Sequence, residues 1–152
     1  MKVVVSPAYK KYSDFIARIP RLFTEDKGDV LYNGRNVIRR FDCDGDAFVV
    51  KRFKRVNFIQ RIVYSFFRRT KAQRAFLLAG ILRERGIDTP HEVAYLEESR
   101  HGLFETGYFV SGLCKDPPAF ASLVPVMDFD KDLARELTRF VVYMHSRGVL
   151  HG

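Results

Sequence analysis

Hydrophobic and polar residues form short β-type runs in two parts of the chain and follow a helical spacing elsewhere. In residues 28–54, three such runs are separated by Asn33-Gly34 and by Asp44-Gly45-Asp46. Asn-Gly and Asp-Gly pairs favour the tight turns of β-hairpins. The pattern therefore predicts an antiparallel meander of three strands, and a further strand pair in residues 91–113 around Arg100-His101-Gly102.

Four other segments show the apolar spacing of helices. They are residues 12–23, with a break at Pro20, and residues 56–67, 71–85 and 130–147. Gly86 and Gly148 follow the last two segments and are typical of helix ends. The apolar stripe of the last helix must be buried against another element; it consists of Leu133, Leu137, Phe140, Val141 and Met144.

The order of these elements predicts the α+β class, with a five-stranded antiparallel sheet and helices on one side of it. With 152 residues, 47% of them hydrophobic, the chain suits one domain better than two. Its first residues lack the apolar run of a secretory signal, and no segment reaches the length of a membrane span. We therefore expect a cytoplasmic protein with two unpaired thiols, Cys43 and Cys114.

Positive charge is concentrated in one stretch. Residues 51–74, from Lys51 to Arg74, contain nine basic residues and no acidic residue, whereas the remaining residues carry a net charge of −1. This distribution indicates an anionic partner, such as phosphate groups, a membrane surface or nucleic acid. A solvated helix face without any partner is the alternative that the residues leave open.

Familiar ligand motifs are absent from the sequence. Asp42-Cys43-Asp44-Gly45-Asp46 begins like a calcium loop, but Ala47 and Phe53 stand where that loop needs Gly and Glu. There is no GxxxxGK[ST] and no GxGxxG sequence, so a nucleotide site would have to be built in another way. We therefore interpret the acidic segment as a hairpin turn.

Lys51 is the residue that calls for an explanation. On a strand it shares one face with Val49 and Phe53, while Arg52 shares the other face with Phe48 and Val50. One of the two neighbouring cations must therefore point toward an apolar side. A buried ammonium group needs a carboxylate or phosphate nearby, whereas on an edge strand Lys51 would extend into water.

Taken together, these elements resemble the small lobe of a protein-kinase-like fold, and most closely the bacterial lipopolysaccharide kinase family, whose members phosphorylate Kdo or heptose sugars. The resemblance spans the chain from about Val30. Three segments carry it: Lys51-Arg52-Phe53-Lys54, Glu84-Arg85-Gly86-Ile87-Asp88-Thr89-Pro90, and the final Val149-Leu150-His151-Gly152. It implies an N-terminal extension in residues 1–27, a small lobe in residues 28–113, and a hinge with the first large-lobe helix in residues 114–152.

The resemblance also implies a set of site residues, with ATP and Mg²⁺ as ligands. Lys51 matches the strand lysine that holds the α- and β-phosphates, and the turn from Tyr32 to Asn36 would cover them. His151 matches the histidine that opens the catalytic loop, where its role is structural. The implied nucleotide-binding residues are Lys51, Asn33, Gly34, Arg35, Val110, Ser111 and Leu113, the last three at the adenine hinge.

The sequence departs from the kinase pattern in three respects. The turn over the phosphates has a single glycine, Gly34, and no Glu or Asp occurs between Lys51 and Leu82 to pair with Lys51. The expected position of that carboxylate lies near Leu77, with Gln73 as the only polar candidate. The catalytic Asp, two residues after the histidine in the family motif, is not in the chain, so we expect a truncated and inactive kinase part.

The leading hypothesis is therefore the N-terminal part of an ATP-dependent lipopolysaccharide-sugar kinase. Its acceptor would be a lipid-linked sugar, and residues 51–74 would face an anionic inner-membrane surface to which the protein binds peripherally. A non-enzymatic basic binding module and a pseudokinase scaffold that binds nucleotide remain as alternatives. A nucleic-acid partner is not favoured.

Overall fold

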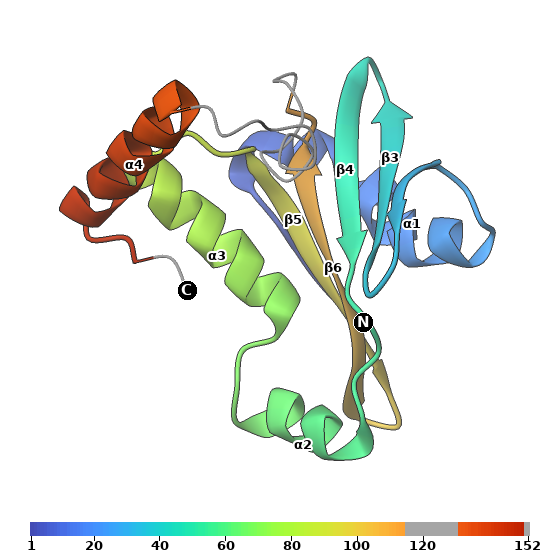
Figure 1. The fold of residues 1–152 in the computed structure, drawn as a ribbon. Coiled ribbons are helices and arrows are strands. Elements are labelled where there is room, and N and C mark those ends of the chain that lie inside the picture. Colours follow the sequence, from blue (N-terminus) through green and yellow to red (C-terminus); the bar gives the residue numbers. More distant parts are fainter. Residues whose placement is uncertain (115–130, 151–152) are drawn as a thin grey trace.

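The fold is built on a six-stranded antiparallel sheet. The computed structural model describes residues 1–114 and 131–150, and its strand order is β1-β5-β6-β4-β3-β2 (Figure 1). The strands are β1 (Lys2–Val5), β2 (Asp29–Asn33), β3 (Val37–Cys43), β4 (Asp46–Arg52), β5 (Glu92–Arg100) and β6 (Leu103–Gly112). The α+β class is confirmed, but the expected count of five strands was too low because β1 pairs with β5 as a sixth.

Two hairpins form where the turn residues predicted them. Asp44 and Gly45 join β3 to β4 with φ values of 50° and 84°, and His101 and Gly102 join β5 to β6 with φ values of 51° and 77°. Positive φ at both central residues matches the right-handed twist of the two paired strands. Local turn chemistry therefore determines the pairing of these strands.

One face of the sheet is covered by a 3-10 helix, η1 (Pro7–Tyr12), and by α1 (Ser13–Thr24). Their apolar side chains form the main core with the sheet residues that point toward α1, among them Phe48 and Val50. The expected break at Pro20 was wrong, because Pro20 lies inside α1. Ile16 and Ile19 on the same helix are completely buried, and this packing compensates for the hydrogen bond that proline cannot donate.

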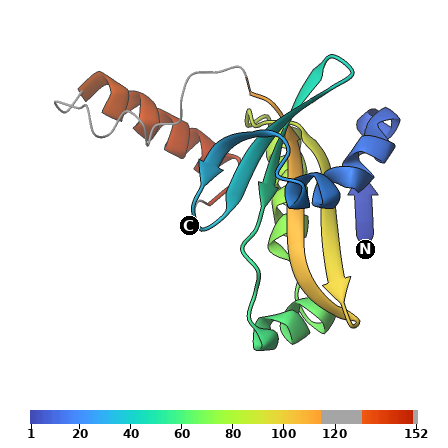
Figure 2. The ribbon, with the colours of Figure 1, turned by 90° about the vertical axis from the view of Figure 1, so that its right-hand side faces the viewer.

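The opposite face carries α2 (Phe58–Phe66) and α3 (Lys71–Glu84). Figure 2 shows α1 in front of the sheet and α3 behind it, so the expectation of helices on one side only was wrong. Phe76 of α3 packs on Tyr95 with 5.4 Å between ring centroids. A Cβ atom on Gly107 would lie 3.0 Å from the Cβ of Ala72, so the glycine permits α3 to approach β6 closely.

The helix α4 (Lys131–Ser146) contacts the C-terminal end of α3. Tyr143 donates a hydrogen bond of 3.0 Å to the Gly86 carbonyl, and Arg85 donates one of 2.6 Å to the Gly148 carbonyl. Both glycines have positive φ, which confirms the predicted helix ends. No residue of α4 is buried, and its predicted apolar stripe is only partly covered, with Phe140 46% exposed.

Candidate functional site

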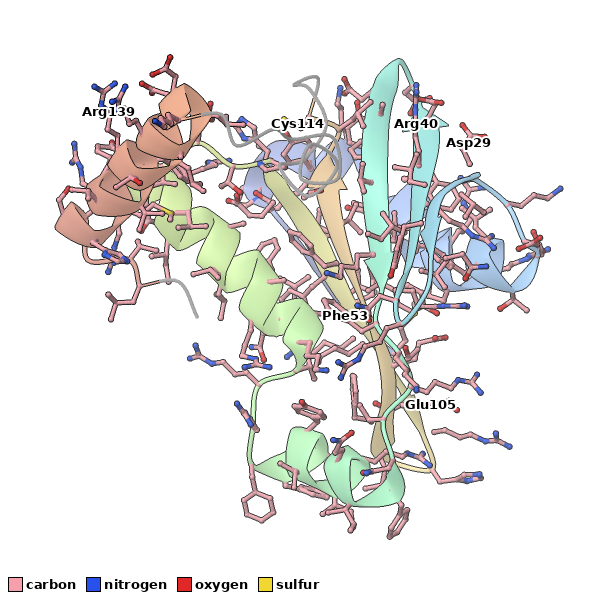
Figure 3. All side chains as sticks on the ribbon, viewed as in Figure 1. Asp29, Arg40, Phe53, Glu105, Cys114 and Arg139 are labelled. Carbon is pink, nitrogen blue, oxygen red and sulfur yellow. The ribbon has the colours of Figure 1, made fainter. Side chains whose placement is uncertain are left out.

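Lys51 lies on the face of the sheet that carries α3. Antiparallel pairing places Lys51 opposite Ile38 on one side and opposite Phe109 on the other. Phe109 is paired in turn with Tyr95, which packs on α3. Because paired residues point to the same face, the Lys51 side chain faces α3, and its ammonium group lies 5.3 Å from the centre of the Phe53 ring. Figure 3 shows Phe53 at the base of the space between the sheet and α3.

A hollow of about 640 Å³ lies between Lys51 and α3. Three further cations line it: Arg69, which precedes α3, and Lys71 and Arg74 in the first turns of that helix. Its apolar lining includes Leu77, Leu78, Ile81 and Phe109, and none of the described residues that line it is acidic. The hollow therefore combines an apolar wall with a positively charged rim.

Lys51 has no acidic partner among the residues that the structure describes, since none of the ion pairs found there involves it. Leu77, near the expected place of a helix carboxylate, does line the hollow, whereas Gln73 does not. Arg74 lines it instead. A helical cation thus occupies the region in which the kinase pattern requires an anion.

The turn between β2 and β3 lies beside a different hollow. Gly34 and Arg35 line a space of about 480 Å³ together with Arg52 and Glu98. Arg52 stacks at 5.1 Å on the ring of Phe23, a residue of α1, so this second hollow opens on the side opposite Lys51. Asn33 is paired with Val37 and exposed. The structure therefore does not bring the expected phosphate-covering turn and Lys51 into one hollow.

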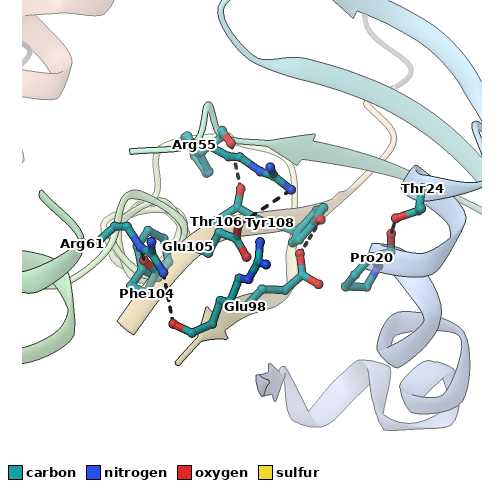
Figure 4. A network of polar contacts seen from close by, with 11 residues as sticks. Pro20, Thr24, Arg55, Arg61, Glu98, Phe104, Glu105, Thr106 and Tyr108 are labelled. Atoms are coloured by element: carbon teal, nitrogen blue, oxygen red, sulfur yellow. Dashed lines mark hydrogen bonds and ion pairs between the residues drawn. The ribbon is translucent and has the colours of Figure 1, made fainter. Parts of the chain in front are cut away.

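Hydrogen bonds connect several of the residues that line the second hollow (Figure 4). The Tyr108 hydroxyl donates a hydrogen bond of 2.8 Å to Glu98, and the Thr106 hydroxyl donates one of 3.0 Å to the Phe53 carbonyl. Burial of the Tyr108 ring, with a smaller effect of the hydrogen bond to Glu98, raises the pKa of its hydroxyl well above the usual range. Tyr108 therefore acts as a neutral donor and has a structural role.

The three expected hinge residues occupy different environments. Val110 and Ser111 are still within β6 and paired with β4 and β5. Val110 is fully buried in the core next to α1, whereas Ser111 is opposite Val49 on the face of Lys51. Leu113 follows the strand, donates its backbone N–H to the Ala47 carbonyl at 3.0 Å, and lines a third hollow of about 610 Å³. His151 lies outside the described residues.

The basic stretch of residues 51–74 separates into groups with different roles. Arg61 donates hydrogen bonds to the carbonyls of Phe104 and Arg100, at 3.0 and 3.1 Å, and so ties α2 to the hairpin of β5 and β6 (Figure 4). Arg55 lies 3.9 Å from Glu105. Sequence reasoning singled out Lys51 but treated the other eight cations alike, and it missed the group at the hollow, although Lys71 and Arg74 have the i, i+3 spacing of neighbours on one helix face.

Large apolar side chains of α2 and the residue after it are exposed. Phe58, Ile59, Phe66 and Phe67 are 64%, 73%, 68% and 82% exposed, and none of the residues of α2 is buried. Arg68 and Arg69 follow directly in the sequence. We call these four apolar residues the α2 tip. Aromatic groups next to cations are typical of surfaces that bind at a membrane interface.

The described residues offer neither a metal site nor a membrane span. In residues 1–114 and 131–150 there is no group of three or more His, Cys, Asp or Glu side chains that could hold a metal ion. No helix in these two segments is long and apolar enough to cross a bilayer. The residues around Lys51 therefore do not provide the ligands for the expected Mg²⁺.

Comparison with solved structures identifies a similar fold. The chain superposes on WaaP, solved in complex with acyl carrier protein, with a TM-score of 0.55 and 19% sequence identity, over 95% of this chain and 57% of that one. The chain has a WaaP-like fold. It spans a little over half the length of the WaaP chain, and neither known family models nor curated proteins give a match. The WaaP-like fold thus supports the predicted lipopolysaccharide-kinase-like architecture.

Proposed function

We propose that this chain forms the nucleotide-binding part of an ATP-dependent kinase that phosphorylates a lipopolysaccharide-core sugar. The observation that carries the proposal is the position of Lys51: it points from a central strand into a hollow, has no carboxylate partner among the described residues, and belongs to a WaaP-like fold. WaaP is a kinase of the lipopolysaccharide core. An ammonium group held on a strand without a counter-ion is suited to the phosphates of a nucleotide.

In this proposal Lys51 binds the phosphates, and the apolar part of the nucleotide lies on the same face of the sheet. Ser111 and Leu113 lie toward the start of β4, and Lys51 lies toward its end. The base would therefore lie near Leu113 and the phosphates near Lys51. The turn at Gly34 would have to move in order to cover the phosphates, because it now lies beside the second hollow.

Binding of a fluorescent ATP analogue to the 152-residue chain tests this proposal. A charge-assisted hydrogen bond contributes about 1.5–3 kcal/mol, so Lys51→Met should weaken binding by roughly ten- to a hundredfold. Lys10→Met is the matched control, because Lys10 is exposed on η1, on the other side of the sheet. Equal affinity of the two variants, or no binding by the unmodified chain, would contradict the proposal.

The finer parts of the proposal concern the acceptor and the transfer step. The acceptor would be a lipid-linked Kdo or heptose sugar, and Mg²⁺ would accompany ATP. By the family resemblance, the catalytic Asp follows His151, so the 152 residues alone should bind ATP without transferring phosphate. Chromatography of ATP and ADP after incubation with the sugar acceptor checks this, and turnover that survives Lys51→Met would exclude the assignment of Lys51. Nucleotide binding without transfer is also what the pseudokinase alternative requires.

A protein partner follows from the same likeness. Because WaaP has been solved in complex with acyl carrier protein, we propose an acyl carrier protein as a candidate partner of this chain as well. Co-purification with an acyl carrier protein is the direct test. A complex that forms equally well after serine replaces Phe66 and Phe67 would place the contact outside the α2 tip.

The α2 tip favours a second candidate function, binding to an anionic membrane surface. Its exposed apolar groups would enter the interface, while Arg68 and Arg69 would lie among lipid headgroups. Co-sedimentation with vesicles that contain phosphatidylglycerol should fall several-fold when Phe66 and Phe67 are replaced by serine. Val142→Ser on α4, where the side chain is 61% exposed, should leave binding unchanged. Binding that depends on salt but not on these side chains would exclude insertion of the tip.

A further inference from the structure

The hollow beside α3 has a property that the kinase assignment does not require: its charged side chains are all cations, and they come from different segments of the chain. Lys51 lies on β4, Arg69 precedes α3, and Lys71 and Arg74 lie within α3. We propose that these four residues form a receptor for a chain of phosphate groups, with Arg74 in place of a helix carboxylate. This inference rests on the proposed function and extends it by naming Arg69, Lys71 and Arg74 as phosphate-binding residues.

The charges at the hollow are not neutralised within the described part of the chain. None of the ion pairs found there involves Lys51, Arg69, Lys71 or Arg74. By contrast, Arg55, Arg83 and Arg39 each pair with a carboxylate. Cations that converge without counter-ions create a positive potential that attracts anions and repels further cations. An anion is therefore the ligand that suits this hollow.

The start of α3 adds to this potential. Lys71 is the first residue of a 14-residue helix, and Thr70 is its N-cap. The partial positive charge of a helix N-terminus favours phosphate groups. Because Thr70 is 3% exposed and its hydroxyl donates a hydrogen bond of 2.6 Å to Glu97 on β5, this end of the helix is held against the sheet. The backbone that carries Lys71 and Arg74 is therefore held in position relative to the sheet.

The shape of the hollow favours a compact polyphosphate over a flat bilayer. The four cations line one open hollow of about 640 Å³ whose wall includes Leu77, Leu78 and Ile81. The headgroups of a membrane form a plane, whereas a triphosphate can enter the space and meet cations from β4 and α3 together. The exposed α2 tip is a separate surface, since none of its four residues lines the hollow. The arrangement also explains how Lys51 can contribute to binding without a helix carboxylate.

The direct test is titration of the full 152-residue chain with inorganic tripolyphosphate in low salt. Arg74→Gln should weaken binding about tenfold, at the lower end for a charge-assisted hydrogen bond because Arg74 is exposed to screening. Arg100→Gln removes the same charge from an exposed position that does not line the hollow. It should change the affinity less than twofold. Equal losses in the two variants would overturn the proposal, because they would show a general effect of net charge.

A charge reversal separates this inference from the proposed function. Arg74→Glu places a carboxylate in the hollow that Lys51 also lines, and it should abolish tripolyphosphate binding while the thermal unfolding midpoint stays unchanged or rises. If tripolyphosphate binds as expected but ATP and ADP do not bind more tightly than it does, the nucleotide proposal fails and the phosphate receptor remains. If ATP binding depends on Lys51 but not on Arg74, the nucleotide proposal remains and the inference about Arg74 is wrong.

Discussion

The attachment of α3 to the sheet depends on Thr70, and replacing this residue with valine should destabilise the protein strongly. Thr70 is 3% exposed, and its hydroxyl makes two hydrogen bonds. It accepts the backbone N–H of Gln73 at 3.1 Å and donates to the Glu97 carboxylate at 2.6 Å. Valine has nearly the same shape and makes neither bond. The substitution therefore isolates the hydrogen bonds from the packing.

The expected decrease in the free energy of unfolding follows from the two hydrogen bonds of Thr70. Removal of a helix N-cap costs about 1 kcal/mol. Loss of a hydrogen bond to a charged group costs about 1.5–3 kcal/mol, and the Glu97 side chain, 13% exposed, has little water to replace it. The lower part of that range applies because Lys2 lies 3.7 Å from the same carboxylate and compensates in part. We expect a total of about 2.5–3 kcal/mol for Thr70→Val.

Urea denaturation followed by circular dichroism measures this loss. With a slope of about 2 kcal/mol/M, a loss of about 3 kcal/mol lowers the midpoint by about 1.5 M. Thr70→Ser is the matched control, because it keeps both hydrogen bonds and removes one methyl group, at a cost of about 1 kcal/mol. If valine and serine gave the same midpoint, the bonds at Thr70 would contribute nothing and the reasoning would be refuted.

Two further predictions concern packing. Gly107→Ala should destabilise the fold by about 1–3 kcal/mol, because its Cβ would lie 3.0 Å from the Cβ of Ala72, whereas Gly112→Ala in the same strand meets no atom within 4 Å and should be neutral in urea denaturation. The partly exposed stripe of α4, with Leu137 40% and Phe140 46% exposed, should bind a hydrophobic dye or promote self-association. Gel filtration as a clean monomer, together with no dye fluorescence, would contradict the second prediction.

Local sequence signals predicted the parts of the fold that depend on neighbouring residues. The hairpin turn at Asp44 and Gly45 needs positive φ, and these residue types tolerate it. Gly86 and Gly148 end helices for the same reason. The pairing of β1 with β5 joins residues such as Val4 and Tyr95, which lie far apart in the chain, and no local pattern indicates it.

The sequence predicted the positions of single residues of the candidate site, but not which residues come together there. Alternation on the strand correctly placed Lys51 and Arg52 on opposite faces, and the structure decides which of them meets α3. The grouping of Arg74 with Lys51 depends on how α3 packs across the sheet, which the spacing along the chain does not contain. The family resemblance implied that Val110 lies at the hinge, whereas in the structure β6 continues through Gly112 and Val110 is buried.

Different helices cover the two faces of the sheet, and substitutions on the two faces should therefore have different effects. Residues that face α1, such as Phe48 and Val50, maintain the core, and changes there affect whether the protein folds at all. Of the residues that line the hollow, Lys51 is partly buried and Arg74 is exposed, and neither belongs to the main core. Evolution can therefore alter what this face binds, one side chain at a time, while the opposite face keeps the scaffold intact.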